Sequence, residues 1–203
     1  SYVMENILFK ISYPAEFHGQ TAVECALKLH PKVKNNLENI KSMKLITQES
    51  GFRIINKIGP LHNPADRDHC LQYMVAVALI DGKLTANSYS HEAAKNPLID
   101  KLREKMQVEE SSTFSQDYLD PAKRSIANRI EIQYGDQILV EEIHYPIGHR
   151  FRREEGIPLL LQKFNENLHA YYSSNKAQFL YEQCTHKSLF SLTVDKFIEL
   201  WML

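Results

Sequence analysis

A short polar segment carries the residue types best suited to acid–base chemistry. Asp66, His69 and Tyr73 are spaced i, i+3 and i+7, so they would share one face of a helix. Arg67 and Asp68 would lie on the neighbouring faces. With backbone N–H groups and the helix dipole, such donors would suit a carboxylate or a phosphate. A structural alternative stays open, in which Arg67 pairs with an adjacent aspartate and His69 is a satisfied core residue.

The helix that must position these residues is predicted to begin at Pro64 and to end before Gly82. Asn63 is a suitable N-cap, and proline suits the first helical position. Every residue in the stretch 74–80 is apolar, so the helix should be buried on all sides. Gly82 can end it in the left-handed conformation. The sequence therefore predicts one buried helix with a polar N-terminal end.

Two further candidates lie near the start of the chain. His18 precedes an amphipathic helix predicted over Ala22–His30, so it stands at a second helix start that can accept an anion. It could equally serve only as a local cap. Lys10 lies in the run Tyr2–Ser12, which is typical of a strand, and it alternates with apolar neighbours. The pattern alone indicates a solvent-facing lysine.

A basic loop is predicted over Pro146–Glu155. It contains four side chains that could clamp a di- or tricarboxylate: His149, Arg150, Arg152 and Arg153. Arg152 and Arg153 more simply pair with the adjacent Glu154 and Glu155. We therefore retain His149 and Arg150 as candidates for substrate binding.

Composition excludes several classes of protein. The chain has 24 basic and 25 acidic residues and a formal net charge of −1, which argues against a nucleic-acid-binding surface. No apolar run approaches the ~20 residues of a membrane span. The cysteines, Cys25, Cys70 and Cys184, are far apart and form no CxxC pair. This predicts reduced, intracellular thiols and no zinc or iron–sulfur ligand set, so we expect no metal and no cofactor.

The remaining patterns predict an α+β fold, in which a small antiparallel or mixed sheet carries packed helices and is followed by C-terminal helices. The best local signal is a hairpin with a Gly135-Asp136 turn. Residues 51–57 suit either a short helix or an edge strand, and residues 109–120 are polar and predicted to form a loop. The other predicted elements are a strand in 37–47, hairpin strands at 125–134 and 137–145, and helices at 96–106, 156–168, 175–185 and 193–200.

Three stretches resemble the MmgE/PrpD family. They are residues 9–22 (FKISYPAEFHGQTA), 63–73 (NPADRDHCLQY) and 145–150 (YPIGHR), in the family's order. No single stretch is chemically diagnostic, but together they are specific, and the similarity covers essentially the whole chain. The resemblance implies that residues 1–155 form the family's C-terminal α+β domain. It also implies that helices in 156–203 pack on a larger helical region preceding this part, so we expect the chain to be the C-terminal portion of a longer enzyme.

The resemblance also implies an activity and its setting. It points to cofactor-independent elimination of water from 2-methylcitrate, giving 2-methylaconitate, in the propionate catabolism of the cytoplasm. The full-length protein would be a homodimer that acts on a small tricarboxylate, with no nucleic-acid or membrane partner. Relatives place a lysine of the first strand in the active site, and Lys10 matches it. The implied catalytic set is Lys10, His18, His69 and Tyr73, with Arg67, His149 and Arg150 as substrate-binding residues.

These residue types fit the chemistry of dehydration. A general base takes the proton next to a carboxylate, an acid protonates the leaving hydroxyl, and cations stabilise the developing enolate. We expect Lys10, His18 and Tyr73 to line one cleft, with Arg67 near its rim. Two alternatives remain open, a related lyase that decarboxylates cis-aconitate and a non-catalytic dimerisation domain. The stretch 63–73 favours the dehydratases.

Overall fold

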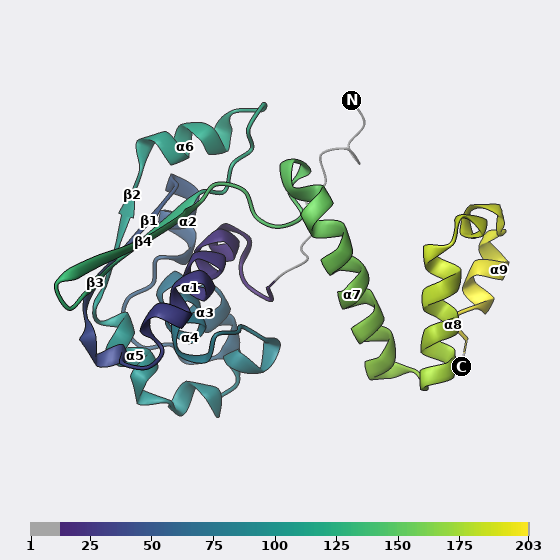
Figure 1. The fold of residues 1–203 in the computed structure, drawn as a ribbon, viewed down its shortest axis with the longest axis horizontal. Helices are drawn as coiled ribbons and strands as arrows, with labels where there is room; N and C mark the ends of the chain where they lie inside the picture. The colour runs from purple at the N-terminus through teal and green to yellow at the C-terminus, as the bar shows by residue number, and fades with distance from the viewer. Residues whose placement is uncertain (1–12, 203) are drawn as a thin grey trace.

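The computed structural model describes residues 13–202. A mixed four-stranded sheet with helices packed against it forms the body, and the C-terminal helices extend away from it (Figure 1). The strand order is β2-β1-β3-β4, with β1 parallel to β2 and antiparallel to β3. This confirms the predicted α+β class with a mixed sheet. The strands are β1 (Ile40–Thr47), β2 (Met106–Glu110), β3 (Asn128–Tyr134) and β4 (Gln137–Ile143).

The β3–β4 hairpin has the predicted register. Tyr134 pairs with Gln137, so Gly135 and Asp136 form a two-residue turn, and Gly135 takes the positive φ of 57° that such turns require. Along β3, Asn128, Ile130 and Ile132 alternate inward and are buried. Because side chains of a strand alternate between faces, one face of the sheet forms the core and the other faces solvent.

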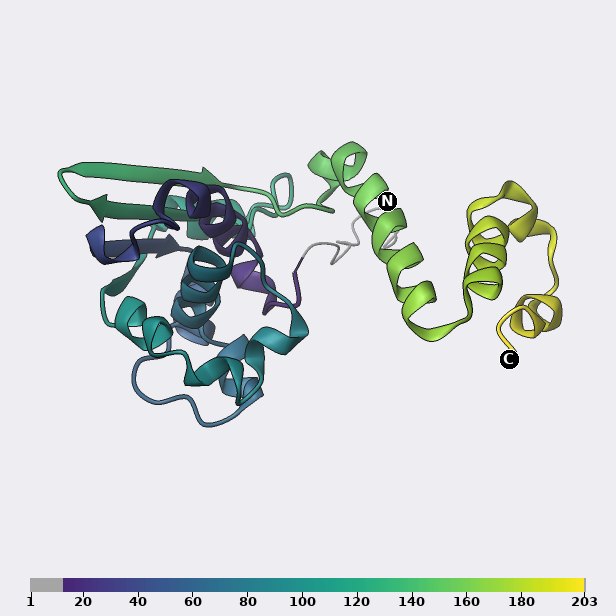
Figure 2. The ribbon, with the colours of Figure 1, turned by 60° about the horizontal axis from the view of Figure 1, so that its bottom comes forward.

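The core is built around α4 (Leu71–Asp81). Every residue from Leu71 to Leu79 is buried, which confirms a helix enclosed on all sides. Its neighbours are α1 (Gln20–Val33), which also packs on β3 and β4, and α5 (Pro97–Arg103), which is capped by the Asn96 side chain. Figure 2 shows the sheet as one layer with α4 beneath it.

The prediction of one continuous helix from Pro64 is wrong. The chain forms a short α3 (Pro64–Asp68), breaks at His69 and Cys70, and resumes as α4. Asn63 caps α3 as predicted, accepting a hydrogen bond from the Asp66 amide at 2.9 Å. Cys70 is buried and extended (φ −122°, ψ 107°), with its thiol 3.5 Å from the Lys57 carbonyl oxygen. Because of this break, Asp66, His69 and Tyr73 do not share a helical face.

The predicted loop over residues 109–120 is also wrong. Residues 109 and 110 belong to the edge strand β2. They are followed by α6 (Ser112–Leu119), which is capped by the Ser111 side chain. The ambiguous stretch 51–57 belongs to a helix, α2 (Glu49–Ile55). Short 3-10 turns complete the described body: η2 (Phe17–Gly19), η3 (Leu37–Asn39), η4 (Ala86–Tyr89), η5 (Ala93–Lys95) and η6 (Arg150–Arg152).

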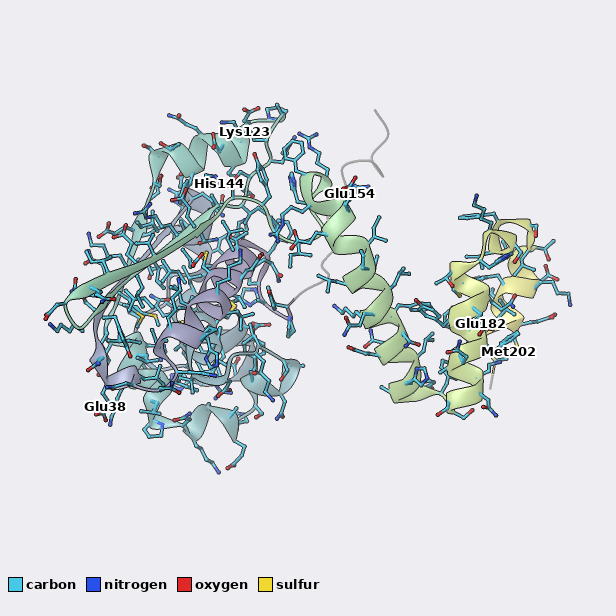
Figure 3. All side chains as sticks on the ribbon, viewed as in Figure 1. Glu38, Lys123, His144, Glu154, Glu182 and Met202 are labelled. Carbon is cyan, nitrogen blue, oxygen red and sulfur yellow. The ribbon has the colours of Figure 1, made fainter. Side chains whose placement is uncertain are left out.

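The C-terminal helices form a separate hydrophobic cluster. Leu168, Ala177 and Leu180 are its buried centre, within α7 (Arg153–Tyr171) and α8 (Ser174–Thr185). After η7 (Lys187–Ser191), α9 (Val194–Glu199) completes the described chain. The far end of this arm, with Glu182 and Met202, stands well away from the body that carries His144 (Figure 3). No described helix is long and apolar enough to cross a membrane.

Gly82 ends α4 in the left-handed conformation, as predicted, and offers a test of local packing. Its φ is +64°, and a methyl group there would lie 2.6 Å from His30 Nε2. The His30 ring is held in place because its Nδ1 lies 2.8 Å from the Leu79 carbonyl oxygen. We expect Gly82→Ala to lower the free energy of unfolding by about 2–3 kcal/mol, through left-handed strain plus the steric clash.

The matched control for this substitution is Gly135→Ala in the hairpin turn. Gly135 has a similar φ of +57°, but a methyl group there would meet nothing within 4 Å. It should therefore show only the backbone strain, about 1 kcal/mol. Urea unfolding followed by circular dichroism measures both variants, and equal losses would refute the clash with His30.

Candidate active site

His18 lies in η2, directly before α1, and its ring is held from both sides. Glu16 Oε2 accepts the His18 backbone N–H at 2.8 Å, and Glu16 Oε1 lies 2.9 Å from the ring Nδ1. The other ring nitrogen, Nε2, is 3.2 Å from the Tyr118 hydroxyl on α6. Burial raises the pKa of Glu16, but the hydrogen bonds from His18 outweigh it and leave this pKa below its ordinary value.

The main chain at His18 is fixed from the sheet. Asn128, buried at the start of β3, donates from Nδ2 to the His18 carbonyl oxygen at 2.8 Å and to Thr21 Oγ1 at 2.7 Å. The Thr21 hydroxyl in turn donates to the Ile126 carbonyl. Sheet and helix start are thus connected through buried polar groups, which places the His18 ring rigidly.

His69 lies at the break between α3 and α4, and its ring pairs with Asp68. Its Nδ1 is 2.6 Å from Asp68 Oδ1, and both side chains are exposed. The backbone N–H of Glu16 donates to the Asp68 carbonyl oxygen at 3.3 Å. The charge of His69 also contributes to lowering the pKa of Glu16. The His69 ring thus pairs with Asp68, whose backbone carbonyl meets the Glu16 amide, and a joint catalytic role for His18 and His69 stays a prediction.

Tyr73, in the first turn of α4, is buried in the core. Its hydroxyl donates to the Ser88 carbonyl oxygen at 2.8 Å, and its ring stacks on Tyr89 with centroids 6.1 Å apart. Burial raises the pKa of Tyr73. It is nevertheless close to the start of α1, because a methyl group built on Gly19 would lie 2.8 Å from Met74 Cε. The residue after His18 thus packs against the residue after Tyr73.

Arg67 is buried among the described residues, and its predicted position near the rim of a cleft stays a prediction. Only 4% of its surface is exposed. Its guanidinium donates to the Tyr89 carbonyl oxygen at 2.8 Å and lies 3.3 Å from His91 Nδ1. The Nε atom of Arg67 has no hydrogen-bond partner among the described residues. The cation therefore sits beneath α3 and beside Tyr73, where it lowers the pKa of that phenol against the effect of burial.

His149 and Arg150 belong to the loop before α7. His149 is buried, stacked on Tyr145 with ring centroids 4.6 Å apart, and its Nδ1 accepts the Phe151 amide. Burial and then the charge of Arg150 lower the pKa of His149, which favours the neutral ring. Arg150 lies over the Phe151 ring and donates to the backbone carbonyls of residues 121–122. These contacts shape the loop, and the substrate-binding role of both residues stays a prediction.

Lys10 lies outside the described residues. The prediction that Lys10, His18 and Tyr73 line one cleft therefore remains a prediction. Of that set, the described contacts place His18 on Glu16 and Tyr118, and Tyr73 on Ser88 and Tyr89.

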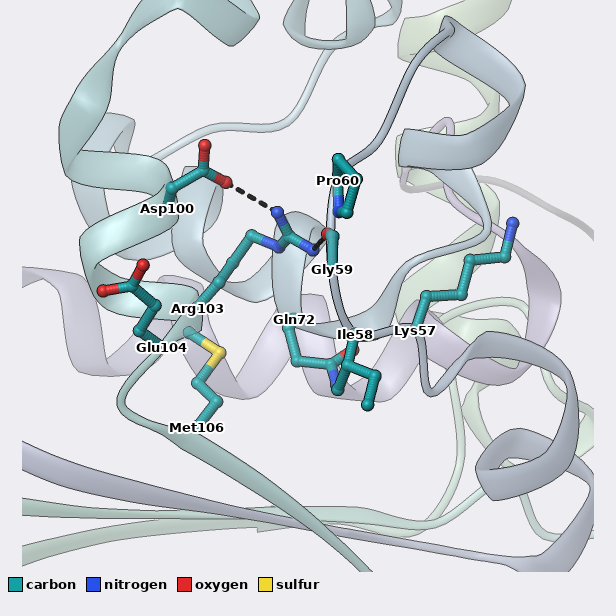
Figure 4. Close-up of a pocket in the computed structure, with 9 residues that line it drawn as sticks. All are labelled: Lys57, Ile58, Gly59, Pro60, Gln72, Asp100, Arg103, Glu104 and Met106. Atoms are coloured by element: carbon teal, nitrogen blue, oxygen red, sulfur yellow. Dashed lines mark hydrogen bonds and ion pairs between the residues drawn. The ribbon is translucent and has the colours of Figure 1, made fainter.

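A cavity of about 460 Å³ lies elsewhere on the body (Figure 4). It is bounded by the segment before α3 and by α5, and Gln72 and Arg103 contribute to its walls. The Arg103 guanidinium is engaged, at 2.6 Å from Asp100 Oδ1 and 2.8 Å from the Gly59 carbonyl oxygen. None of the predicted site residues lines it. The cavity is therefore no part of the candidate site.

The described residues offer acid–base groups and no metal-ligand set. No group of three or more His, Cys, Asp or Glu side chains among residues 13–202 is placed to hold a metal ion. Cys25 and Cys70 are buried and free, and burial raises the pKa of the Cys25 thiol, which disfavours a nucleophilic thiolate. Proton transfer by His18 is the chemistry that the described part of the site supports best.

Sequence reasoning missed three residues of this arrangement, Glu16, Tyr118 and Asn128. A signal for Glu16 was present, because a carboxylate two residues before a histidine at a helix start can reach both its ring and its amide. Tyr118 and Asn128 are 100 or more residues from their partners, and nothing in the local sequence connects them to His18.

Comparison with known proteins finds a matching family model and similar relatives. The family model for the MmgE/PrpD C-terminal domain matches residues 13–187. The chain is 50% identical to a probable 2-methylcitrate dehydratase of Saccharomyces cerevisiae, over 99% of the chain and 40% of the relative. It is 49% identical to the mitochondrial 2-methylcitrate dehydratase of Yarrowia lipolytica, over 100% of this chain and 40% of the relative. It is 45% identical to the 2-methylcitrate dehydratase of Escherichia coli (strain K12), over 100% of this chain and 43% of the relative. The chain thus spans about two fifths of the length of these relatives.

Proposed function

The chain belongs to the MmgE/PrpD family, and on this premise we propose that it is the C-terminal part of a 2-methylcitrate dehydratase. The observation that best supports this proposal is 45–50% identity to 2-methylcitrate dehydratases across essentially the whole chain. The family model matches residues 13–187, a range that includes His18, His69 and Tyr73. The arrangement of His18 between Glu16 and Tyr118 supports proton transfer at this place.

In the proposed reaction, water is eliminated from 2-methylcitrate to give 2-methylaconitate. A histidine of the pair His18 and His69 exchanges the proton next to a carboxylate, and Lys10 is proposed to stabilise negative charge on the substrate. Gly19, next to His18, packs against Met74, next to Tyr73, and Arg67 is buried. The remaining acid–base groups would come from the three fifths of the relatives that this chain does not span. No metal ion or cofactor enters the proposal.

The arrangement of the whole protein is part of the same proposal. Residues 1–155 would form the α+β domain, and residues 156–203 would pack on a helical region of the complete protein. Apolar side chains left exposed along α7 and α8, such as Ile157 and Phe179, support this packing. We propose a homodimer that acts in the cytoplasm or, as the name of the Yarrowia lipolytica relative suggests, in mitochondria.

The test is an assay of the complete protein, in which this chain follows the region that the relatives carry in addition. Incubation with 2-methylcitrate should yield 2-methylaconitate, identified by NMR of the product mixture. Release of carbon dioxide from cis-aconitate instead would assign the decarboxylase alternative. Absence of both reactions together with no tricarboxylate binding would indicate a non-catalytic dimerisation domain.

Residues 1–203 alone should show no measurable dehydration of 2-methylcitrate. Groups that act as a unit lose nearly all rate when one member is missing, and here only part of the acid–base set is present. The measurement is the same product assay, with the complete protein as the positive control. Robust turnover by residues 1–203 would show that the missing region contributes no catalytic group.

A further inference from the structure

Glu16 holds both the main chain and the ring of His18. One carboxylate oxygen accepts the His18 amide at 2.8 Å and the other lies 2.9 Å from Nδ1. An ionised carboxylate only accepts hydrogen bonds, so the ring must present Nδ1–H to it. Only 11% of the His18 side chain and 13% of the Glu16 side chain are exposed, which limits competition from water. Neutral His18 therefore carries its proton on Nδ1 and its lone pair on Nε2.

Tyr118 faces the other nitrogen. Its hydroxyl is 3.2 Å from His18 Nε2, and the two rings lie at 48° with centroids 5.6 Å apart. A phenol can donate to the Nε2 lone pair or accept from Nε2–H once the ring is protonated. It therefore tolerates either tautomer and cannot select between them. The selection rests on Glu16.

We propose that Glu16 is a positioning residue that fixes the tautomer in which His18 Nε2 exchanges a proton with the substrate. This inference rests on the proposed dehydratase function. Nε2 takes the proton from the carbon beside a carboxylate, and the electron pair of that C–H bond forms the C=C double bond. The hydroxyl leaves as water with a proton from a separate general acid. Glu16 stabilises the resulting imidazolium and takes no proton, and the Tyr118 hydroxyl yields its place at Nε2 to the substrate.

Glu16→Gln in the complete protein tests the proposal most directly. The His18 backbone N–H can only donate, so it should retain the side-chain amide oxygen of the introduced glutamine and leave the NH2 group facing Nδ1. That arrangement favours the wrong tautomer, with the proton on Nε2. We expect kcat to fall by about a hundredfold, within the usual contribution of one positioned acid–base group, with KM changed less than threefold.

The matched control is Glu142→Gln. Glu142 also pairs with a histidine two residues later, with Oε1 2.8 Å from His144 Nε2, but this pair is on the exposed hairpin. Its kcat should stay within twofold of the wild type. Tyr118→Phe should keep the His18 tautomer, because Glu16 sets it. Glu16→Ala removes both hydrogen bonds between Glu16 and His18. It covers the case in which the side-chain amide of the introduced glutamine is reversed, with its oxygen facing Nδ1.

The readout independent of activity is the 15N NMR spectrum of selectively histidine-labelled complete protein. The His18 signals are assigned by their loss in His18→Gln. We expect Nδ1–H in the wild type and in Tyr118→Phe, and Nε2–H in Glu16→Gln. A wild-type ring with its proton on Nε2, or a Glu16→Gln protein with unchanged kcat and tautomer, overturns the proposal. A wild type that shows the expected tautomer but dehydrates no 2-methylcitrate overturns the proposed function instead.

Discussion

Replacing His18 by glutamine in the complete protein should lower kcat/KM for 2-methylcitrate by about a thousandfold. A positioned acid–base group typically contributes 10²–10⁴-fold, about 3–5 kcal/mol of transition-state stabilisation. His18 is the described residue best placed for this role, because Glu16, Tyr118 and Asn128 fix both its ring and its main chain. The loss should appear mainly in kcat, since proton transfer belongs to the transition state. Steady-state kinetics with product detection gives both parameters.

The control for this result is His144→Gln. His144 is also paired with a glutamate, but it is 42% exposed on the hairpin and has no role in the proposed chemistry. Its kcat/KM should remain within twofold of the wild type. Circular dichroism should show that both variants fold. A His18→Gln protein with kcat/KM within threefold of the wild type would remove His18 from the proposed mechanism.

Replacing Arg152 by methionine should lower the free energy of unfolding by about 3–5 kcal/mol, as breaking a buried ion pair does. Arg152 donates to both oxygens of Glu24, at 2.8 and 2.9 Å, and to the Tyr145 carbonyl oxygen at 2.7 Å. The Glu24 carboxylate is only 7% exposed, and without Arg152 the one cation left near it in the described part of the chain is Lys28, at 3.7 Å, whose side chain is half exposed. The hydrogen bonding of Arg152 to the Glu24 carboxylate is also the main reason for the raised pKa of Arg152.

Replacing the partner instead, by Glu24→Gln, should lower the free energy of unfolding by less, about 1–2 kcal/mol. Arg152 is then still paired with Glu155 at 2.7 Å and keeps the Tyr145 carbonyl. Lys196→Met is the control, because the Lys196–Glu199 pair is exposed on both sides and should contribute below about 1 kcal/mol. Chemical unfolding measures all three proteins. Equal effects of Arg152→Met and Lys196→Met would contradict a buried ion pair between α1 and the start of α7.

The sequence alone determined the features that depend on near neighbours. The apolar stretch 74–80 predicted a helix enclosed on all sides, Asn63 and Gly82 marked a helix start and a helix end, and the Gly135-Asp136 turn gave the hairpin its register. Each rests on interactions within a turn or along one element, which residue type and spacing largely decide. The three family-like stretches likewise predicted the family and His18 as a site residue.

Tertiary structure decided the features whose partners lie far along the chain. The helix breaks at His69 and Cys70, where the buried Cys70 thiol meets the distant Lys57 carbonyl, although residue types there suit a continuous helix. The strand β2 exists because residues 106–110 pair in parallel with β1, which a polar local composition does not reveal.

The candidate site shows the same division most clearly. His18 was a candidate from its place before a helix, but its ring also contacts Tyr118 and its main chain Asn128, each about 100 residues distant. Arg152 pairs with Glu24 across 128 residues, where the sequence indicated only its neighbouring acids. Local propensity acts over a few residues, whereas these hydrogen bonds form only once the sheet and α1 have packed together. The sequence therefore determined which groups could do chemistry, and the tertiary structure determined which atoms they face.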